Sequence, residues 1–215
     1  MRISGGEAKG RLIRVPAGGR VRPTTDRARE SLFNILSTVA EKSFLDLFAG
    51  SGIVGLEALS RGAGLSVFVE KDFRIASALK ASISGFGFAN RAEVISAPVY
   101  KALEILRQKG KRFDIIFADP PYDEGLAIET IHLMENGELM APNGVFVLQH
   151  SAREITGELE TGSISLTDKR RYGDTILSFF RKEASDGGCR GAGFNDENGS
   201  SAAGKSIKNS KGECP

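Results

Sequence analysis

A glycine-rich turn near residue 50 constrains the fold of this 215-residue chain more than any other feature. Residues 44–48 are mostly apolar and have the length of a buried strand. Gly50, Gly52 and Gly55 follow in the spacing G-x-G-x-x-G, and residues 53–61 then show the apolar spacing of a helix. This order of strand, glycine turn and helix is typical of parallel α/β sheets that bind a nucleoside-bearing ligand at the turn.

Strand-like and helical segments alternate along most of the chain. We predict strands at 44–48, 65–70, 92–96, 114–118, 145–149, 163–167 and 175–180. The first expected helix begins at Thr24 or Thr25. Further helices are expected at 53–61, 73–84, 99–109 and 126–136. Only residues 168–174 separate the last two strands, so those strands should form an antiparallel hairpin. The predicted fold is α/β, a Rossmann-like seven-stranded, mostly parallel sheet in the order of class I methyltransferases.

The two ends of the chain differ in composition from its centre. Residues 1–29 hold eight basic residues against only Glu7 and Asp26, and the eight are Arg2, Lys9, Arg11, Arg14, Arg20, Arg22, Arg27 and Arg29. We predict a basic arm or short hairpin over 1–23 that binds a polyanion, although a solvated terminus has the same composition. Residues 184–215 are rich in Gly, Ser, Asn and Lys, which predicts a disordered tail after a folded domain at 24–183.

Several classes of protein are disfavoured by composition. The chain has no apolar run of the length that a membrane span needs and no secretory signal pattern, so we expect a cytoplasmic protein that does not bind a membrane. Cys189 and Cys214 both lie in the polar tail, which suggests reduced thiols. With His132 and His150 as the only histidines, we expect neither a metal site nor a histidine-dependent nucleophile.

Two carboxylates flank the glycine turn. Glu70 ends the next predicted strand, where it can accept hydrogen bonds from ribose hydroxyls of any adenosine-bearing cofactor. Asp46 directly precedes the turn and suits the cationic end of S-adenosylmethionine, whereas it would repel a pyrophosphate. The turn alone still leaves a dinucleotide possible. We predict cofactor contacts from Asp46, Phe48, Ala49, Gly50, Ser51, Gly52, Glu70 and Ala97.

A second motif, D-P-P-Y, follows the predicted strand at 114–118. Asp119 and the carbonyl of Pro120 can accept both N–H groups of an exocyclic base amine and so orient its lone pair. Pro120 and Pro121 stiffen the turn, and Tyr122 can stack on a base removed from its helix. Hydride transfer has no use for such a turn. The two motifs together therefore favour a base amino-methyltransferase with these four residues at the target site.

These motifs and several longer runs resemble the RsmD type of guanine-N2 methyltransferase of small-subunit ribosomal RNA. The resemblance covers residues 1–182 and includes RISGG from Arg2, RPTTDRARESLFN over 22–34, LEALSRGA over 56–63 and RYG over 171–173. It implies transfer of a methyl group to a guanine 2-amino group of 16S rRNA, on an assembled or assembling 30S subunit. Nothing in the sequence suggests more than a monomer. It also implies RNA contacts near the catalytic mouth, for which we select Arg11, Arg22, Arg27 and Arg29.

This sequence departs from the family pattern at two strand ends. Ser96-Ala97-Pro98 stands where many relatives have an Asp or Asn that can bind adenine, and the fifth strand ends in Gln149-His150 rather than in an acid. Two other functions stay open at this point. One is a DNA adenine-N6 or other amino-methyltransferase, and the other is a non-catalytic RNA-binding assembly factor. The sequence does not indicate which guanine is modified.

Overall fold

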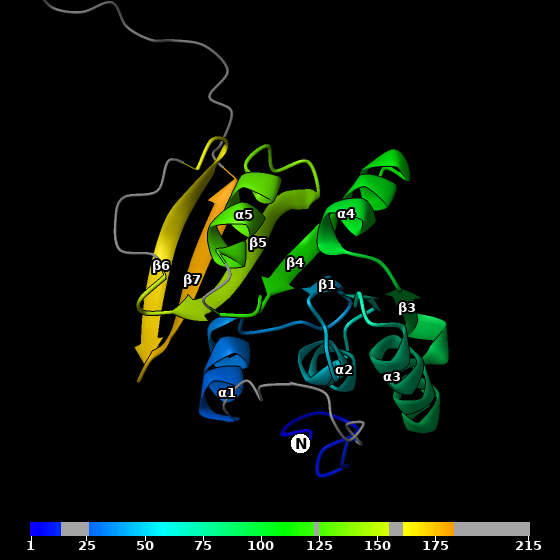
Figure 1. The fold of residues 1–215 in the computed structure, drawn as a ribbon. Coiled ribbons are helices and arrows are strands. Elements are labelled where there is room, and N and C mark those ends of the chain that lie inside the picture. The colour runs from blue at the N-terminus through cyan, green and yellow to red at the C-terminus, as the bar shows by residue number, and fades with distance from the viewer. Residues whose placement is uncertain (14–25, 123–124, 155–160, 183–215) are drawn as a thin grey trace, which may run out of the picture. The chain divides into compact units, whose positions relative to one another are not determined.

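Seven strands form one mixed sheet in the order β3-β2-β1-β4-β5-β7-β6 (Figure 1). The strands from β1 to β5 are parallel, and β7 runs antiparallel to both of its neighbours. This arrangement confirms the predicted fold class. The strands are β1 (Ser43–Leu47), β2 (Leu65–Val69), β3 (Ala92–Ile95), β4 (Phe113–Ala118), β5 (Met140–Ser151), β6 (Ile164–Tyr172) and β7 (Thr175–Lys182).

The computed structural model describes residues 1–13, 26–122, 125–154 and 161–182. The predicted tail at 184–215 lies outside these ranges, as do Arg14, Arg20, Arg22 and the expected helix start at Thr24 or Thr25. None of the helices within the described ranges has the length and apolar character needed to cross a membrane. The same ranges contain no group of three or more His, Cys, Asp or Glu residues that could hold a metal ion.

Helices cover both faces of the sheet (Figure 1). On one face lie α1 (Asp26–Ile35), α2 (Ile53–Ser60) and α3 (Phe73–Phe86), and on the other lie α4 (Val99–Gln108) and α5 (Leu126–Met134). Successive side chains of β4 point to opposite faces, so Phe117 packs with the first group of helices while Ile116 and Ala118 pack with the second. Strands buried on both faces need apolar side chains at every position, which explains the continuous apolar runs of the sequence.

The last hairpin differs from the prediction. β6 continues to Tyr172 instead of ending at Thr167, and its pairing with β7 leaves only Gly173 and Asp174 in the turn. The run Lys169–Arg171 is therefore part of a strand and not of a loop. β6 forms an edge of the sheet and most of its side chains are exposed, so charged residues are tolerated there and hide the strand pattern.

The N-terminal residues pack against the domain. Arg2 and Leu12 pair in an antiparallel bridge, and Ile3, Ala8 and Ile13 are buried in the core shared by α1, α2 and α3. Glu57 of α2, which is fully buried, anchors this segment: its carboxylate accepts hydrogen bonds from the backbone N–H and the hydroxyl of Ser4, each at 2.8 Å. The described part of the predicted basic arm is thus held against α2.

Candidate active site

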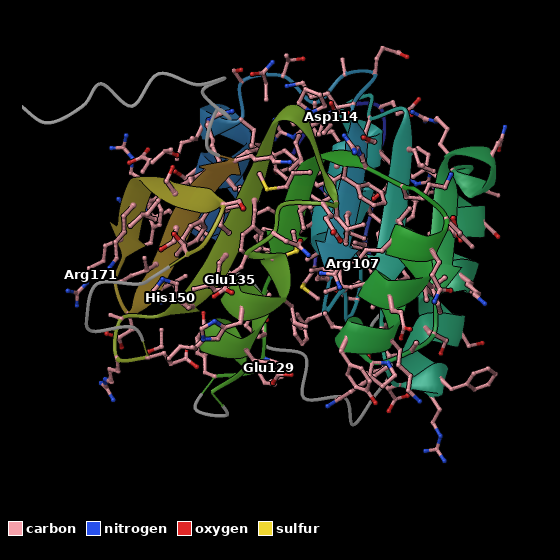
Figure 2. The ribbon with its side chains drawn as sticks, turned by 90° about the horizontal axis from the view of Figure 1, so that it is seen from above. Arg107, Asp114, Glu129, Glu135, His150 and Arg171 are labelled. Atoms are coloured by element: carbon pink, nitrogen blue, oxygen red, sulfur yellow. The ribbon has the colours of Figure 1, made fainter. Side chains whose placement is uncertain are left out.

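The glycine turn and the D-P-P-Y turn lie at the same edge of the sheet. β1 and β4 are adjacent parallel strands in which Asp46 is level with Phe117 and Leu47 with Ala118, so the turns that follow them are neighbours. Both turns line one cavity of about 760 Å³. Figure 2 shows at which end of the sheet the cavity lies. Glu129, which lines the cavity, lies toward one end, and Asp114, at the start of β4, lies toward the other. The carboxyl ends of parallel strands are the usual ligand site of such sheets.

The cavity brings together all but one of the residues predicted for the cofactor and the target base. Its lining includes the predicted cofactor contacts Asp46, Phe48, Ala49, Gly50, Ser51, Glu70 and Ala97 and the predicted target-site residues Asp119, Pro120, Pro121 and Tyr122. The sequence did not identify the other lining residues as site residues, because they lie at ordinary positions in strands, in helices and in the turns after strands. These are Ile53, Val54, Val69, Lys71, Asp72, Ile75, Pro98, Val99, Tyr100, Phe117, Leu126, Glu129, Thr130 and Leu133.

Gly52 is the predicted cofactor residue that does not line the cavity. Its backbone has φ +74°, and a Cβ atom at this position would lie 2.3 Å from Cδ1 of Leu79 on α3. Glycine is therefore required because the turn is left-handed and passes close to α3. Phe48 also has a left-handed backbone, with φ 61°, although a bulky residue is rarely found there. Strain of this kind is concentrated at ligand-binding turns.

Glu70 holds two turns in place from the end of β2. One carboxylate oxygen accepts a hydrogen bond from the backbone N–H of Gly50 at 2.9 Å, and the other accepts one from the N–H of Asp72 at 2.8 Å. Each carboxylate oxygen can accept more than one hydrogen bond, so Glu70 can still bind hydroxyl groups of a ligand in the cavity.

Asp46 is the most perturbed acid at the site. Its carboxylate is 2% exposed and accepts a hydrogen bond from the N–H of Gly55 at 2.9 Å. Burial raises the pKa of Asp46 to about 8, with smaller contributions from the negative charges of Asp119 and Glu70, while the Gly55 hydrogen bond opposes the rise. Asp46, Glu70 and Asp119 thus line one cavity together with Asp72 and Glu129, and a cationic group placed among these acids would stabilise their charged forms.

Comparison with known proteins identifies the family. Residues 1–181 match the family model described as Conserved hypothetical protein 95. "Ribosomal RNA small subunit methyltransferase D" of Escherichia coli (strain K12) is 36% identical over 187 residues, which are 86% of this chain and 91% of that protein. The protein of the same name from Buchnera aphidicola subsp. Acyrthosiphon pisum is 37% identical over 153 residues, with 71% and 78% covered. The chain belongs to the RsmD family.

Solved structures of similar proteins have the same architecture. The Escherichia coli protein yhhF is 35% identical, with a TM-score of 0.73, and the match covers 86% of this RsmD-family chain and 99% of yhhF. The Thermus protein TTHA0928 is also 35% identical, with a TM-score of 0.69 over 83% of this chain and 98% of that one. A ribosomal protein L11 methylase from Lactobacillus delbrueckii, at 15% identity and a TM-score of 0.60, shares the fold.

The arginines selected for RNA contact are dispersed in this RsmD-family structure. Arg22 lies outside the described residues, and Arg27 is exposed on the first turn of α1. Arg11 donates hydrogen bonds to the carbonyls of Gly85 and Phe86, at the last turn of α3. Because α3 has 14 residues, this end lies about 20 Å along the helix from the cavity. Arg11 thus interacts with the end of α3 that is remote from the site.

Arg29 requires a correction. Its side chain is only 1% exposed, with Nε 3.6 Å from a carboxylate oxygen of Glu57 and Nη2 donating to the carbonyl of Arg2 at 2.9 Å. A guanidinium in this position cannot contact a phosphate without leaving the core and exposing the buried charge of Glu57. The prediction that Arg29 binds RNA is therefore wrong, because the sequence did not reveal its ion-pair partner on α2.

Proposed function

We propose that this protein transfers a methyl group from S-adenosylmethionine to an exocyclic amino nitrogen of a base, the 2-amino group of a guanine in small-subunit ribosomal RNA. One observation carries the proposal: the glycine turn and the D-P-P-Y turn line the same cavity. A methyl donor held at the first turn and a base amine held at the second would therefore lie in the same cavity, close enough to react. We further propose that the protein acts as a cytoplasmic monomer on the assembling or assembled 30S subunit.

The cofactor end of the cavity fits this methyl donor. When bound, S-adenosylmethionine would supply a methyl group on a positively charged sulfur: a nitrogen nucleophile would form a bond to the methyl carbon as the C–S bond breaks, and the neutral thioether would leave. Asp46 is suited to the ammonium and sulfonium charges of this molecule, because a cation beside it would lower its raised pKa and stabilise the charged carboxylate. Glu70 is suited to the ribose hydroxyls. Ala97 has no side chain that can bind adenine, so adenine would depend on backbone groups here.

The target end of the cavity fits an amine that is bonded to an aromatic ring. The lone pair of such an amine is delocalised, so acceptors for both N–H groups make the nitrogen a better nucleophile. We assign these acceptors to the carboxylate of Asp119 and the carbonyl of Pro120 and base stacking to Tyr122. After transfer the nitrogen carries an extra proton, and Asp119 is positioned to take it. A stronger base is unnecessary because the methylated amine is acidic.

The named relatives support the same substrate class. The similar proteins from Escherichia coli and Buchnera are named as methyltransferases of the small subunit's ribosomal RNA. The structure of SMU.776, which is 18% identical and has a TM-score of 0.60, is described as complexed with SAH, the demethylated cofactor. These names favour the RNA enzyme over a DNA methyltransferase.

The proposal is tested by methyl transfer to three substrates. We expect labelled methyl groups to reach 30S subunits or their 16S RNA but not duplex DNA, and nuclease digestion should recover the label as N2-methylguanosine. Asp119→Ala should lower kcat by at least about a hundredfold while leaving the affinity for the cofactor unchanged. Asp174→Ala, which removes an exposed carboxylate from the β6–β7 turn, is the control.

The other outcomes identify the alternatives. Label on adenine in DNA would establish the DNA amino-methyltransferase. Normal RNA binding without cofactor binding would establish the assembly factor. If Asp119→Ala lowered cofactor affinity as much as turnover, the assignment of Asp119 to the target base would be refuted.

A further inference from the structure

Two aromatic side chains are exposed beside the cavity. Phe73 is 76% exposed and Tyr100 is 52% exposed. Phe73 is the first residue of α3, and Tyr100 is the second residue of α4. Exposed aromatic rings are costly to leave in water, and a pair of them beside a ligand cavity indicates a binding surface.

The two rings belong to adjacent turns at the catalytic edge. β2 and β3 are neighbouring parallel strands, with Val69 level with Ile95, and the N–H of Glu70 donates to the carbonyl of Ile95 at 3.2 Å. The turn after β2 leads directly to Phe73, and the turn after β3 leads to Tyr100. Asp72, next to Phe73, and Tyr100 itself line the cavity. Tyr100 is therefore part of the cavity wall, and Phe73 is the next residue after a wall residue.

Basic side chains alternate with these rings. Lys71, Arg74 and Lys101 are all exposed, and Nζ of Lys101 lies 5.9 Å from the centre of the Tyr100 ring. The one acid among them, Asp72, already accepts hydrogen bonds from the N–H groups of Arg74 and Ile75 as the N-cap of α3. We call Lys71, Phe73, Arg74, Tyr100 and Lys101 the aromatic rim. It combines flat apolar faces with a net positive charge.

We propose that the aromatic rim binds unpaired nucleotides next to the target base, with Phe73 and Tyr100 stacking on bases and the three cations contacting phosphates. This inference rests on the proposed function, since it assumes an RNA substrate. Single-stranded nucleic acid is the ligand that requires both features, because every base has a face to stack and every nucleotide carries a phosphate. A base amine also becomes accessible only when the base is out of its helix.

The rim also supplies what the predicted RNA contacts lack. Among those that the structure describes, Arg29 is buried, Arg11 lies at the far end of α3, and Arg27 is exposed on α1, none of whose described residues lines the cavity. Lys71 lines the cavity itself, and Arg74 and Lys101 adjoin residues that do. Positive charge at the mouth would attract the phosphates of the RNA backbone, which the acids inside the cavity would repel.

Binding of a short, fluorescein-labelled single-stranded oligoribonucleotide tests the stacking. Phe73→Leu and Tyr100→Leu keep the apolar character but remove the ring, and each should weaken RNA binding about tenfold. Phe73→Trp and Tyr100→Phe keep a ring and should bind RNA as the unchanged protein does. Leu166→Ala removes an exposed apolar side chain from β6, at the other edge of the sheet, and is the control.

Charge is tested separately. The triple variant K71Q/R74Q/K101Q should lower the slope of log Kd against log salt concentration by about 2, because each lost contact to a single strand removes about 0.7. An unchanged slope would show that these cations do not contact phosphates, and unchanged RNA affinity in both leucine variants would overturn the rim. Loss of cofactor affinity instead of RNA affinity in Tyr100→Leu would also overturn it, by assigning Tyr100 to the cofactor.

The readout separates this inference from the proposed function. RNA binding is measured without methyl transfer, so rim-dependent binding by a protein that transfers no methyl group would support the rim and refute the proposed reaction. Conversely, normal methyl transfer with an unchanged RNA KM in the double variant F73L/Y100L would refute the rim alone.

Discussion

Replacing Asp46 by asparagine should change the pH dependence of stability in a defined direction. Burial raises the pKa of Asp46 from 3.8 to about 8 in the folded protein. Between these values the unfolded chain ionises Asp46 while the folded protein keeps it protonated, so the folded state binds more protons. The free energy of unfolding should therefore fall as pH rises, by about 1.4 kcal/mol per pH unit from this residue alone.

Asp46→Asn removes this dependence and retains an oxygen that can accept from the N–H of Gly55. Between pH 5 and pH 7 the stability of the variant relative to the unchanged protein should rise by roughly 2.6 kcal/mol. The assay is urea unfolding of both proteins at the two pH values. An effect of the substitution on the free energy of unfolding that does not depend on pH is the same at both pH values and cancels. Contributions of other titrating groups are common to both proteins and cancel as well; one such group is His150, the pKa of which is lowered by burial.

Parallel pH profiles of the two proteins would refute this reasoning. That result would mean that Asp46 ionises in the folded protein as it does in the unfolded chain, and that the cavity is wet enough to solvate its charge. Binding of S-adenosylmethionine at pH 7 would then release no proton from Asp46.

Two further predictions concern the same edge of the sheet. Binding of S-adenosylmethionine at pH 7 should release close to one proton, because its cationic end lowers the pKa of Asp46 from about 8. Calorimetry in buffers of different ionisation enthalpy should detect this release. The substitution Asp46→Asn should abolish it. Gly52→Ala should lower the free energy of unfolding by about 1–3 kcal/mol because of its left-handed backbone and the close approach of α3. Gly85→Ala, in α3 with open space around it, should instead stabilise the protein by up to about 1 kcal/mol, and thermal unfolding measures both.

The central part of the fold was predictable because its sequence pattern follows from burial. Strands β1, β2 and β4 are covered by helices on both faces, which requires apolar side chains and makes their limits readable. Glycines with positive φ at 50 and 52 mark the turn that crosses the end of the sheet. Parallel strands have their carboxyl ends at one edge, so the two motif turns were bound to lie close together once the strands were assigned to adjacent positions.

Features that depend on a distant partner were not predictable. The burial of Arg29 depends on Glu57, which lies 28 residues away on another helix, and no periodicity links the two. The length of β6 depends on its being an edge strand, where exposure allows charged residues at most positions. The exposure of Phe73 follows from its place at the first turn of α3, where the helix emerges from the sheet, whereas an apolar residue in a helix is usually expected in the core.

The cavity and the aromatic rim beside it differ in charge. Asp46, Glu70 and Asp119 line the cavity, and their mutual repulsion contributes to the raised pKa of Asp46. Such a cavity would repel the phosphates of RNA but would attract a cationic cofactor and the N–H groups of a base. Lys71 on the cavity wall and Lys101 next to the wall residue Tyr100 are both exposed, so a polyanion can reach them. We therefore expect a neutral base to be bound in the cavity and the phosphates of the proposed RNA substrate to be bound at the aromatic rim.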